Sequence, residues 1–287
     1  MSRFTNPVSG VNGVVAGATA TVAVQNNRRI HGFLISYSNT ASRTAVRNAT
    51  QAEIEADIGE IRFLANGKPL RRSSAAELNI INNLNGVAPR AGQLLMQFST
   101  SKTRTPDGEE WGAFTAFGIP GITLEIDIAA AAAGPQLSID CEYDFYPDRN
   151  KGFILWEKRS IVNPTAGDYD LNDLTKNGAY SRIHLMTDKI SRVRAQIDDS
   201  DVHDRTPDKI AAWLAKHGMT VQAGTTPVVF DYTQQRSDAL DMTRKASDGK
   251  TDVPVNSFNL KITHTAGVAS YYLISERLIG NVAAYVV

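Results

Sequence analysis

Cysteine is almost absent from this sequence: Cys141 is the single one among 287 residues. One thiol cannot form a disulfide within the chain, so the fold must be held by its packed core rather than by covalent cross-links. Cys141 stands between Ile139 and Tyr143 on the apolar side of an alternating segment. This position predicts a buried strand residue rather than a reactive nucleophile.

An excess of charge is also missing, because 30 basic residues balance 30 acidic ones. Proteins whose main task is to coat nucleic acid usually carry a basic excess, so sequence-specific nucleic-acid binding is not expected. No apolar run approaches the ~20 residues of a membrane span. Met1–Gly13 lacks the hydrophobic segment of a secretory signal. We therefore expect a soluble protein that is made in a reducing cytoplasm.

Catalytic motifs are missing as well: the sequence contains no H-E-x-x-H, no G-x-S-x-G and no P-loop. The histidines are scattered along the chain, at His31, His184, His203, His217 and His264. The densest acidic run, Ile197–Asp204, has the oxygen ligands that Ca²⁺ prefers but not the spacing and central glycine of a helix–loop–helix calcium site. A solvated turn before the following helix is the favoured interpretation, and a structural calcium ion is the alternative. We predict no catalytic, cofactor-binding or metal-ligating residue and no required cofactor.

A run of five alanines, Ala129–Ala133, is the most distinctive feature that is present. It lies between Ile122–Ile128 and Leu137–Phe145, whose apolar residues alternate with polar ones as in half-buried strands. Five alanines are too few for an isolated helix, which needs roughly 12–15 residues, and Gly134-Pro135 would end one. We predict a compact connection between two strands, close to another backbone, with an ordinary loop as the alternative.

Two predicted helices reveal an internal repeat. Ala75–Asn85 follows the N-cap Ser74, and Pro207–His217 follows the N-cap Thr206. The two N-caps are 132 positions apart, and strands before and after the helices recur in the same order at offsets between 132 and 150. The first half therefore has about 18 extra residues, which we place in Ser38–Ile58. We predict that the two halves are structural duplicates.

Each half combines short alternating strands with one helix. Strands rarely alternate with helices, which disfavours a parallel βαβ sheet, whereas a double-sheet jelly roll accommodates one helix in a connection. We predict an all-β fold of two tandem jelly-roll β-sandwiches, residues 1–147 and 148–287, joined through Tyr146–Gly152. Residues 1–13 are expected to form an N-terminal arm that is disordered in the isolated subunit.

Several polar segments have no assigned chemistry. Thr100–Gly121 and Gln234–Asn256 are long loops at matching places in the two halves, which indicates either a shared exposed face or drift of tolerant surface loops. Gly67–Arg72 contains three cations, expected on a solvated turn, with a phosphate site as the alternative. Trp213 and Leu214 are expected as core contacts of the second helix.

Four stretches of this sequence resemble a known family: "FTNPVSGVNGVVAGATATV", "GEIRFLANGKPL", "EIDIAAAAAGPQLS" and "VRAQIDDSDVHDRTPDKIAAWLAKHG". The chain is similar to the double jelly-roll major capsid proteins of tailless, membrane-containing bacteriophages, the corticovirus coat protein in particular. The resemblance implies a homotrimer whose six barrels tile an icosahedral shell over an internal lipid membrane. It also implies contacts with neighbouring trimers and with penton, other minor capsid and membrane proteins, a place in the virion capsid, and synthesis in the cytoplasm of a bacterial host.

Two other function classes remain as alternatives. The first is a jelly-roll module that binds carbohydrate or a receptor, which would need an exposed aromatic platform such as Trp111, Phe114 and Phe117. The second is a cupin-like enzyme, which would need closely spaced metal-binding histidines; His184 has no histidine two residues away. The oligomeric state of the purified protein separates these classes: a stable trimer favours a coat protein, and a monomer with affinity for glycans favours the binding module.

Overall fold

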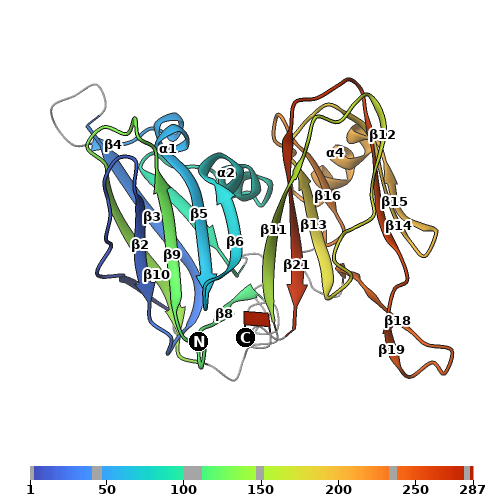
Figure 1. Cartoon of the computed structure of the whole chain (residues 1–287), viewed down its shortest axis with the longest axis horizontal. Helices are drawn as coiled ribbons and strands as arrows, with labels where there is room; N and C mark the ends of the chain where they lie inside the picture. The colour runs from blue at the N-terminus through green and yellow to red at the C-terminus, as the bar shows by residue number, and fades with distance from the viewer. Residues whose placement is uncertain are drawn as a thin grey trace. The chain divides into compact units, whose positions relative to one another are not determined.

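The computed structural model describes residues 3–40, 47–99, 112–146, 152–232, 238–280 and 285–286 (Figure 1). The chain divides into two compact units. The first unit is Met1–Trp156 together with Gly280–Val287, and the second is Glu157–Ile279. Most of the predicted linker Tyr146–Gly152 lies outside the described residues.

The first unit is built from two antiparallel sheets. The strands of one sheet are β1 (Phe4–Pro7), β10 (Gln136–Asp144), β3 (Arg29–Asn39), β4 (Arg47–Asn48), β7 (Gln93–Gln97) and β8 (Phe114–Thr115). The strands of the other are β2 (Thr19–Val24), β9 (Ile122–Ile128), β5 (Ile58–Ala65) and β6 (Lys68–Ser74).

The second unit repeats this plan. Its first sheet contains β11 (Phe153–Ile161), β21 (Tyr271–Ile279), β13 (Ala179–Leu185), β16 (Thr226–Val229) and β17 (Leu240–Asp241). The boundary between the units falls within β11, whose first four residues belong to the first unit. Its second sheet contains β12 (Gly167–Leu171), β20 (Phe258–His264), β14 (Ile190–Ile197) and β15 (Ser200–Arg205), and a separate hairpin is formed by β18 (Thr243–Lys245) and β19 (Asp252–Pro254).

The two units share one strand order. In the first sheets, the neighbouring strands β1-β10-β3 correspond to β11-β21-β13. In the second sheets, β2-β9-β5-β6 corresponds to β12-β20-β14-β15. In each unit the first strand shares a sheet with the last, and the second strand lies in the opposite sheet, which is the winding of a jelly roll. The predicted all-β fold and the predicted duplication are therefore confirmed.

Alternating side chains fill the space between the sheets. Along β9, Leu124 and the isoleucines are buried, whereas Thr123 and Glu125 are half-buried. The core of the first unit centres on Phe63, whose ring centroid lies 4.9 Å from those of Phe98 and Phe114. Each such ring that is fully buried stabilises the fold by roughly 1.5–3 kcal/mol. Ile183, Val193, Leu260 and Leu273 belong to the corresponding core of the second unit.

Three helices are described. α2 (Ala75–Leu84) and α4 (Pro207–Lys216) lie where they were predicted. The predicted N-cap Ser74 forms a capping box with Glu77. The sequence analysis missed α1 (Gln51–Asp57), which begins after a second capping box made by Thr50 and Glu53. α1 falls within the extra segment Ser38–Ile58, and it lies beside α2 (Figure 1).

The alanine run is a tight connection between β9 and β10, as predicted. Its backbone is held at both ends, because Ala129 N donates to Asp57 O at 2.7 Å and Thr40 N donates to Ala133 O at 2.8 Å. Gly17 N donates to Ala129 O at 3.2 Å, so a third segment approaches closely. Within the run, Ala132 is buried and Ala131 is exposed.

The prediction of a disordered N-terminal arm is wrong. Phe4–Pro7 forms β1, which pairs antiparallel with β10 so that Phe4 lies opposite Tyr143. Val8 N continues the pairing by donating to Ile139 O at 2.8 Å. These residues are the first strand of the first jelly roll, because backbone hydrogen bonds to β10 satisfy them without any neighbouring molecule.

Three other predictions need correction. Arg71, expected on a solvated turn, is buried and stacks on Phe98 with its guanidinium carbon 4.6 Å from the ring centroid. Much of the acidic run Ile197–Asp204, expected as a solvated turn, belongs to β15, where the Asp204 carboxylate accepts a hydrogen bond from Arg192 at 2.6 Å. Trp213, expected in the core, is 43% exposed, whereas Leu214 is buried as predicted.

Candidate interaction surfaces

Large apolar side chains that stay exposed mark surfaces that meet another molecule when they gather in one place. Among the described residues, the exposed large apolar side chains are Phe4, Val15, Phe145, Tyr146, Val162, Val202, Trp213 and Tyr272. Three of them gather on one edge of the first unit. Another lies in an aromatic and cationic group on α4 of the second unit.

The edge patch consists of Phe4, Phe145 and Tyr146 around the buried Tyr143. The ring centroids of Phe4 and Phe145 lie 5.8 and 5.4 Å from that of Tyr143. The guanidinium carbon of Arg28 lies over the Tyr143 ring, 3.8 Å from its centroid, which is a cation–π contact. Phe4 is 44% and Phe145 50% exposed, so the patch presents aromatic rings to the outside.

A buried charge cluster fixes the base of the edge patch. Asp144 accepts hydrogen bonds from Arg29 Nη2 at 2.6 Å and lies 2.7 Å from His31 Nε2. It also accepts from the backbone N–H of Tyr146 at 2.9 Å, which holds the chain as it leaves β10. Burial alone would raise the pKa of Asp144, but the hydrogen bonds from His31 and Arg29 outweigh it and lower the pKa below its usual range.

The helix patch consists of Trp213, Lys216 and His217 from α4 and its end, with Arg205 and Tyr232 beside them. The Tyr232 ring centroid lies 6.3 Å from that of Trp213 and 5.3 Å from that of His217. The guanidinium carbon of Arg205 lies 5.0 Å from the Trp213 ring centroid, and Lys216 Nζ lies 4.8 Å from it. Arg205 also donates a hydrogen bond to the Tyr232 hydroxyl, so the cations and rings form one ordered group.

The equivalent helices differ in how they are covered. α2 lies beside α1, and Asn79 donates hydrogen bonds to Gln51 and Glu55 of α1 at 2.9 and 2.8 Å. Residue 211, the counterpart of Asn79, is an exposed alanine, and no second helix is present beside α4 in the described part of that unit. Trp213 is 43% exposed, whereas Ile81, its counterpart in α2, is buried. An apolar side chain on a helix is buried only where a neighbouring element covers it.

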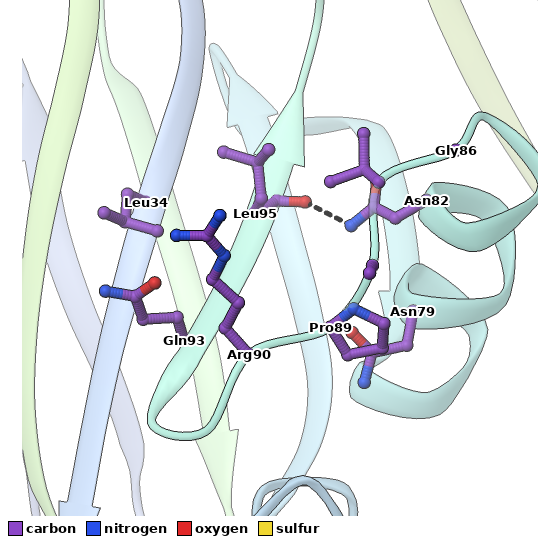
Figure 2. Close-up of a pocket in the computed structure, with 10 residues that line it drawn as sticks. Leu34, Asn79, Asn82, Gly86, Pro89, Arg90, Gln93 and Leu95 are labelled. Carbon is purple, nitrogen blue, oxygen red and sulfur yellow. Dashed lines mark hydrogen bonds between the residues drawn. The ribbon is translucent and has the colours of Figure 1, made fainter.

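A groove of about 560 Å³ lies beside α2 in the first unit (Figure 2). Leu34 and Leu95 form an apolar wall, and the segment from Gly86 to Arg90 runs along the other side. Asn82 Nδ2 donates to Leu95 O at 2.7 Å and ties the helix to β7 (Figure 2). The groove lining combines leucines, amides and one arginine, and contains neither a carboxylate nor a histidine that would act as a general base.

The histidines and acidic residues make structural contacts. Among the described residues, no group of three His, Cys, Asp or Glu side chains could hold a metal ion. His184 lies 2.9 Å from Glu276, and burial lowers the pKa of His203 to about 4. Burial likewise raises the pKa of the Cys141 thiol to about 12, in accord with its predicted place in a strand. No helix in the described ranges is long and apolar enough to cross a membrane.

The acidic run Ile197–Asp204 forms a hairpin between β14 and β15. Its turn residues Asp198 and Asp199 have φ values of 47° and 65°. Asp198 accepts hydrogen bonds from the backbone N–H groups of Asn256 and Ser257 at 2.8 and 2.9 Å. Its other oxygen lies 2.8 Å from Arg244, so protein groups already satisfy this carboxylate.

The aromatic platform proposed for a binding module is not formed as expected. Phe114 is fully buried in the core of the first unit, and Phe117 is half-buried. Trp111 and most of the loop Thr100–Gly121 lie outside the described residues, as does part of Gln234–Asn256. The sequence analysis also did not identify the edge patch or the helix patch as surface features.

Comparison with solved structures shows the same fold in viral capsid proteins. The major capsid protein P2 from bacteriophage PM2 superposes with a TM-score of 0.81 at 17% identity, covering 96% of this chain and 97% of that one. The STIV major capsid protein gives 0.69 at 13% identity over 99% of both chains. The PBCV-1 virus capsid protein gives 0.61 at 8% identity, with 96% and 93% covered.

Sequence comparison with protein families assigns the chain. The viral coat protein P2 N-terminal domain matches residues 5–144, and the viral coat protein P2 C-terminal domain matches residues 157–278. No curated protein matches the sequence. The two domain matches fall in the two jelly rolls and together span well over half of the chain, which therefore belongs to the viral coat protein P2 family.

Proposed function

We propose that this chain is the major capsid protein of a tailless, membrane-containing bacteriophage and that it assembles as a homotrimer. The observation that carries the proposal is the duplication: two jelly rolls with one strand order lie in one chain of a coat-protein family. Three such chains supply six similar barrels, so a threefold oligomer presents nearly sixfold packing to its neighbours. Such trimers tile an icosahedral shell.

The composition fits side-by-side packing of many copies. With 30 basic and 30 acidic residues the chain has no net charge at pH 7, so neighbouring copies do not repel one another strongly. The family gives the chain a structural rather than an enzymatic role, and it disfavours the binding module and the cupin-like enzyme. A place in the virion capsid follows from the same family.

The remaining partners are part of the proposal. Neighbouring trimers meet along barrel flanks, penton and other minor capsid proteins fill the remaining positions, and the shell encloses a lipid membrane. The chain is synthesised in the cytoplasm of the bacterial host. Assembly needs no cofactor, and the alternative is a structural calcium ion at Ile197–Asp204. Melting temperatures measured with Ca²⁺ and with a chelator test this alternative. A higher melting temperature with Ca²⁺ would support a bound calcium ion.

The mass of the purified chain in solution tests the proposal. Light scattering behind a sizing column should give three times 31.2 kDa, with no shift in the presence of soluble glycans. A stable monomer that binds a glycan would contradict the coat-protein proposal and support the binding module.

A further inference from the structure

We propose that the groove beside α2 is a binding site for a medium-chain fatty acid, a carboxylate that carries a short aliphatic chain. The proposal adds a ligand to the coat protein and does not depend on how its copies assemble. The volume of the groove, about 560 Å³, lies within the range of about 300–1,000 Å³ in which proteins hold small molecules. The groove combines apolar walls with a cationic group, which is the arrangement that such an anion requires.

The walls of the groove suit an aliphatic chain. Leu34 of β3 and Leu95 of β7 are half-buried, and they lie side by side because they are directly paired across the two strands. Residues 87–89, a valine, an alanine and a proline, form the opposite wall (Figure 2). A chain that lies between these walls removes apolar surface on both sides from water, which favours binding.

The polar side chains of the groove are of two kinds. Asn82 Nδ2 donates to Leu95 O at 2.7 Å, and Asn79 Nδ2 donates to two side chains of α1, so protein acceptors already occupy both amide groups. The described residues provide no hydrogen-bond partner for the guanidinium of Arg90 or for the side-chain amide of Gln93. A guanidinium has several N–H donors and no acceptor, and a glutamine amide contributes further donors. The unused hydrogen-bonding capacity of the groove is therefore mainly that of a donor, and it is positively charged.

A carboxylate satisfies these donors. Its two oxygens match the planar guanidinium in a pair of parallel hydrogen bonds, and such charge-assisted bonds are among the strongest that proteins make. No carboxylate among the lining residues competes for Arg90. Figure 2 shows the Arg90 side chain extending from its loop towards Leu34 and Leu95. An anion that Arg90 holds there places its aliphatic chain on the leucines.

The groove is formed before any ligand arrives, because hydrogen bonds hold its loop at both ends. Directly after α2, Val87 N donates to Asn82 O at 2.9 Å. At the other end, the Arg90 carbonyl accepts from Gln93 N at 3.0 Å and from the side chain of Gln51. Binding to a pre-formed groove requires little ordering of the chain and costs correspondingly little conformational entropy.

The second jelly roll shows that the fold itself does not need the two asparagines. At the offset of 132 positions, Asn79 and Asn82 correspond to Ala211 and Leu214 of α4. Neither of these side chains can donate a hydrogen bond, yet α4 forms at the equivalent place in its unit. The hydrogen bond that ties α2 to β7 is therefore particular to the first jelly roll, where it shapes the groove.

The test measures binding of octanoate to the purified full-length chain by saturation-transfer difference NMR, with octylammonium as a probe of equal length and opposite charge. Arg90→Gln removes the cation, and Ala88→Trp fills the groove without changing the charge. Arg159→Gln is the matched control, because this half-buried arginine of the second unit pairs with Asp173 at 2.7 Å, away from the groove. Circular dichroism and thermal melts establish that each variant is folded.

Octanoate should bind the wild type and the Arg159→Gln control with equal affinity. Octylammonium should bind about tenfold more weakly or less, and Arg90→Gln should weaken octanoate binding about tenfold, because hydrogen bonds to a charged group contribute at least that factor. Ala88→Trp should abolish binding of octanoate.

Three results would overturn the proposal: no octanoate binding to the wild type below its micelle concentration, equal affinities for octanoate and octylammonium, or unchanged octanoate affinity in a folded groove variant. A peptide that ends in leucine, binds more tightly than octanoate and loses its affinity when its terminus is amidated would also overturn the fatty acid, and would assign the groove to a protein C-terminus. None of these results bears on the proposed function, which the mass of the oligomer tests separately.

Discussion

The alanine run makes a sharp prediction, because two neighbouring alanines in it differ in burial. Ala132 is 6% exposed, whereas Ala131 is exposed at the turn. We predict that Ala132→Leu destabilises the fold and that Ala131→Leu, the matched control, does not. The same three carbon atoms are added in both variants, so helix propensity and hydrophobicity change equally.

The structure sets the magnitude. Ala132 N donates to Ala129 O at 3.1 Å, and the flanking residues are tied to Asp57 and Thr40 by hydrogen bonds of 2.7 and 2.8 Å. The connection therefore cannot move outward to make room without breaking backbone hydrogen bonds. Overpacking at such a site lowers the free energy of unfolding by about 1–3 kcal/mol. An exposed substitution stays within about ±0.5 kcal/mol.

Urea denaturation followed by far-UV circular dichroism measures both variants. Ala132→Leu should lower the midpoint with an unchanged m-value, while Ala131→Leu should coincide with the wild type. Equal midpoints for the two variants would refute the reasoning that the run is kept small by close backbone approach.

Three further predictions concern the charge clusters and the first strand. Burial lowers the pKa of His203 to about 4, below the ~6.5 of an exposed histidine, so stability should fall as the pH drops from about 6.5 towards 4. His203→Leu should flatten that profile of unfolding free energy against pH, and an unchanged slope would exclude His203 as its source. The pKa of Asp144 is lowered, so the stability that its carboxylate contributes is present above pH ~4 and is lost at more acidic pH. Asp144→Asn should lower the unfolding free energy at pH 7 by about 3–5 kcal/mol, because the charge on Arg29 stays buried. A loss below 1 kcal/mol in chemical denaturation would argue against that buried pair. Deletion of residues 3–7 should lower the melting temperature of the isolated subunit, because β10 loses its partner β1. An unchanged melting temperature would restore the interpretation of an N-terminal arm that is disordered in the isolated subunit.

The repeat could be predicted from the sequence because its signals are local. The N-caps Ser74 and Thr206 and the alternating strands keep their spacing, and these patterns do not depend on distant residues. The first strand was missed because all four residues of β1 are exposed, so it lacks the alternation of a half-buried strand. A signal was nevertheless present, since Asn6-Pro7 recurs as Asn163-Pro164 at the start of the second half.

The two patches could not be predicted from periodicity. Phe4 contacts Phe145 only because the first and last strands of a jelly roll are neighbours. Arg205 contacts Tyr232 although α4 and β16 separate them in the sequence. Trp213 lies on an apolar helical stripe, but whether a stripe is buried depends on what covers it. The helix α1 could have been found, because Thr50 and Glu53 form the same capping signature as Ser74 and Glu77.

A cryo-electron microscopy reconstruction of the purified oligomer, at a resolution that resolves strands, tests the central claim most directly. The account predicts a threefold particle in which three chains supply six jelly rolls, with the first and second jelly rolls alternating around the ring. A particle with a different number of chains, or one in which only one of the two jelly rolls contributes to the ring, would contradict the account.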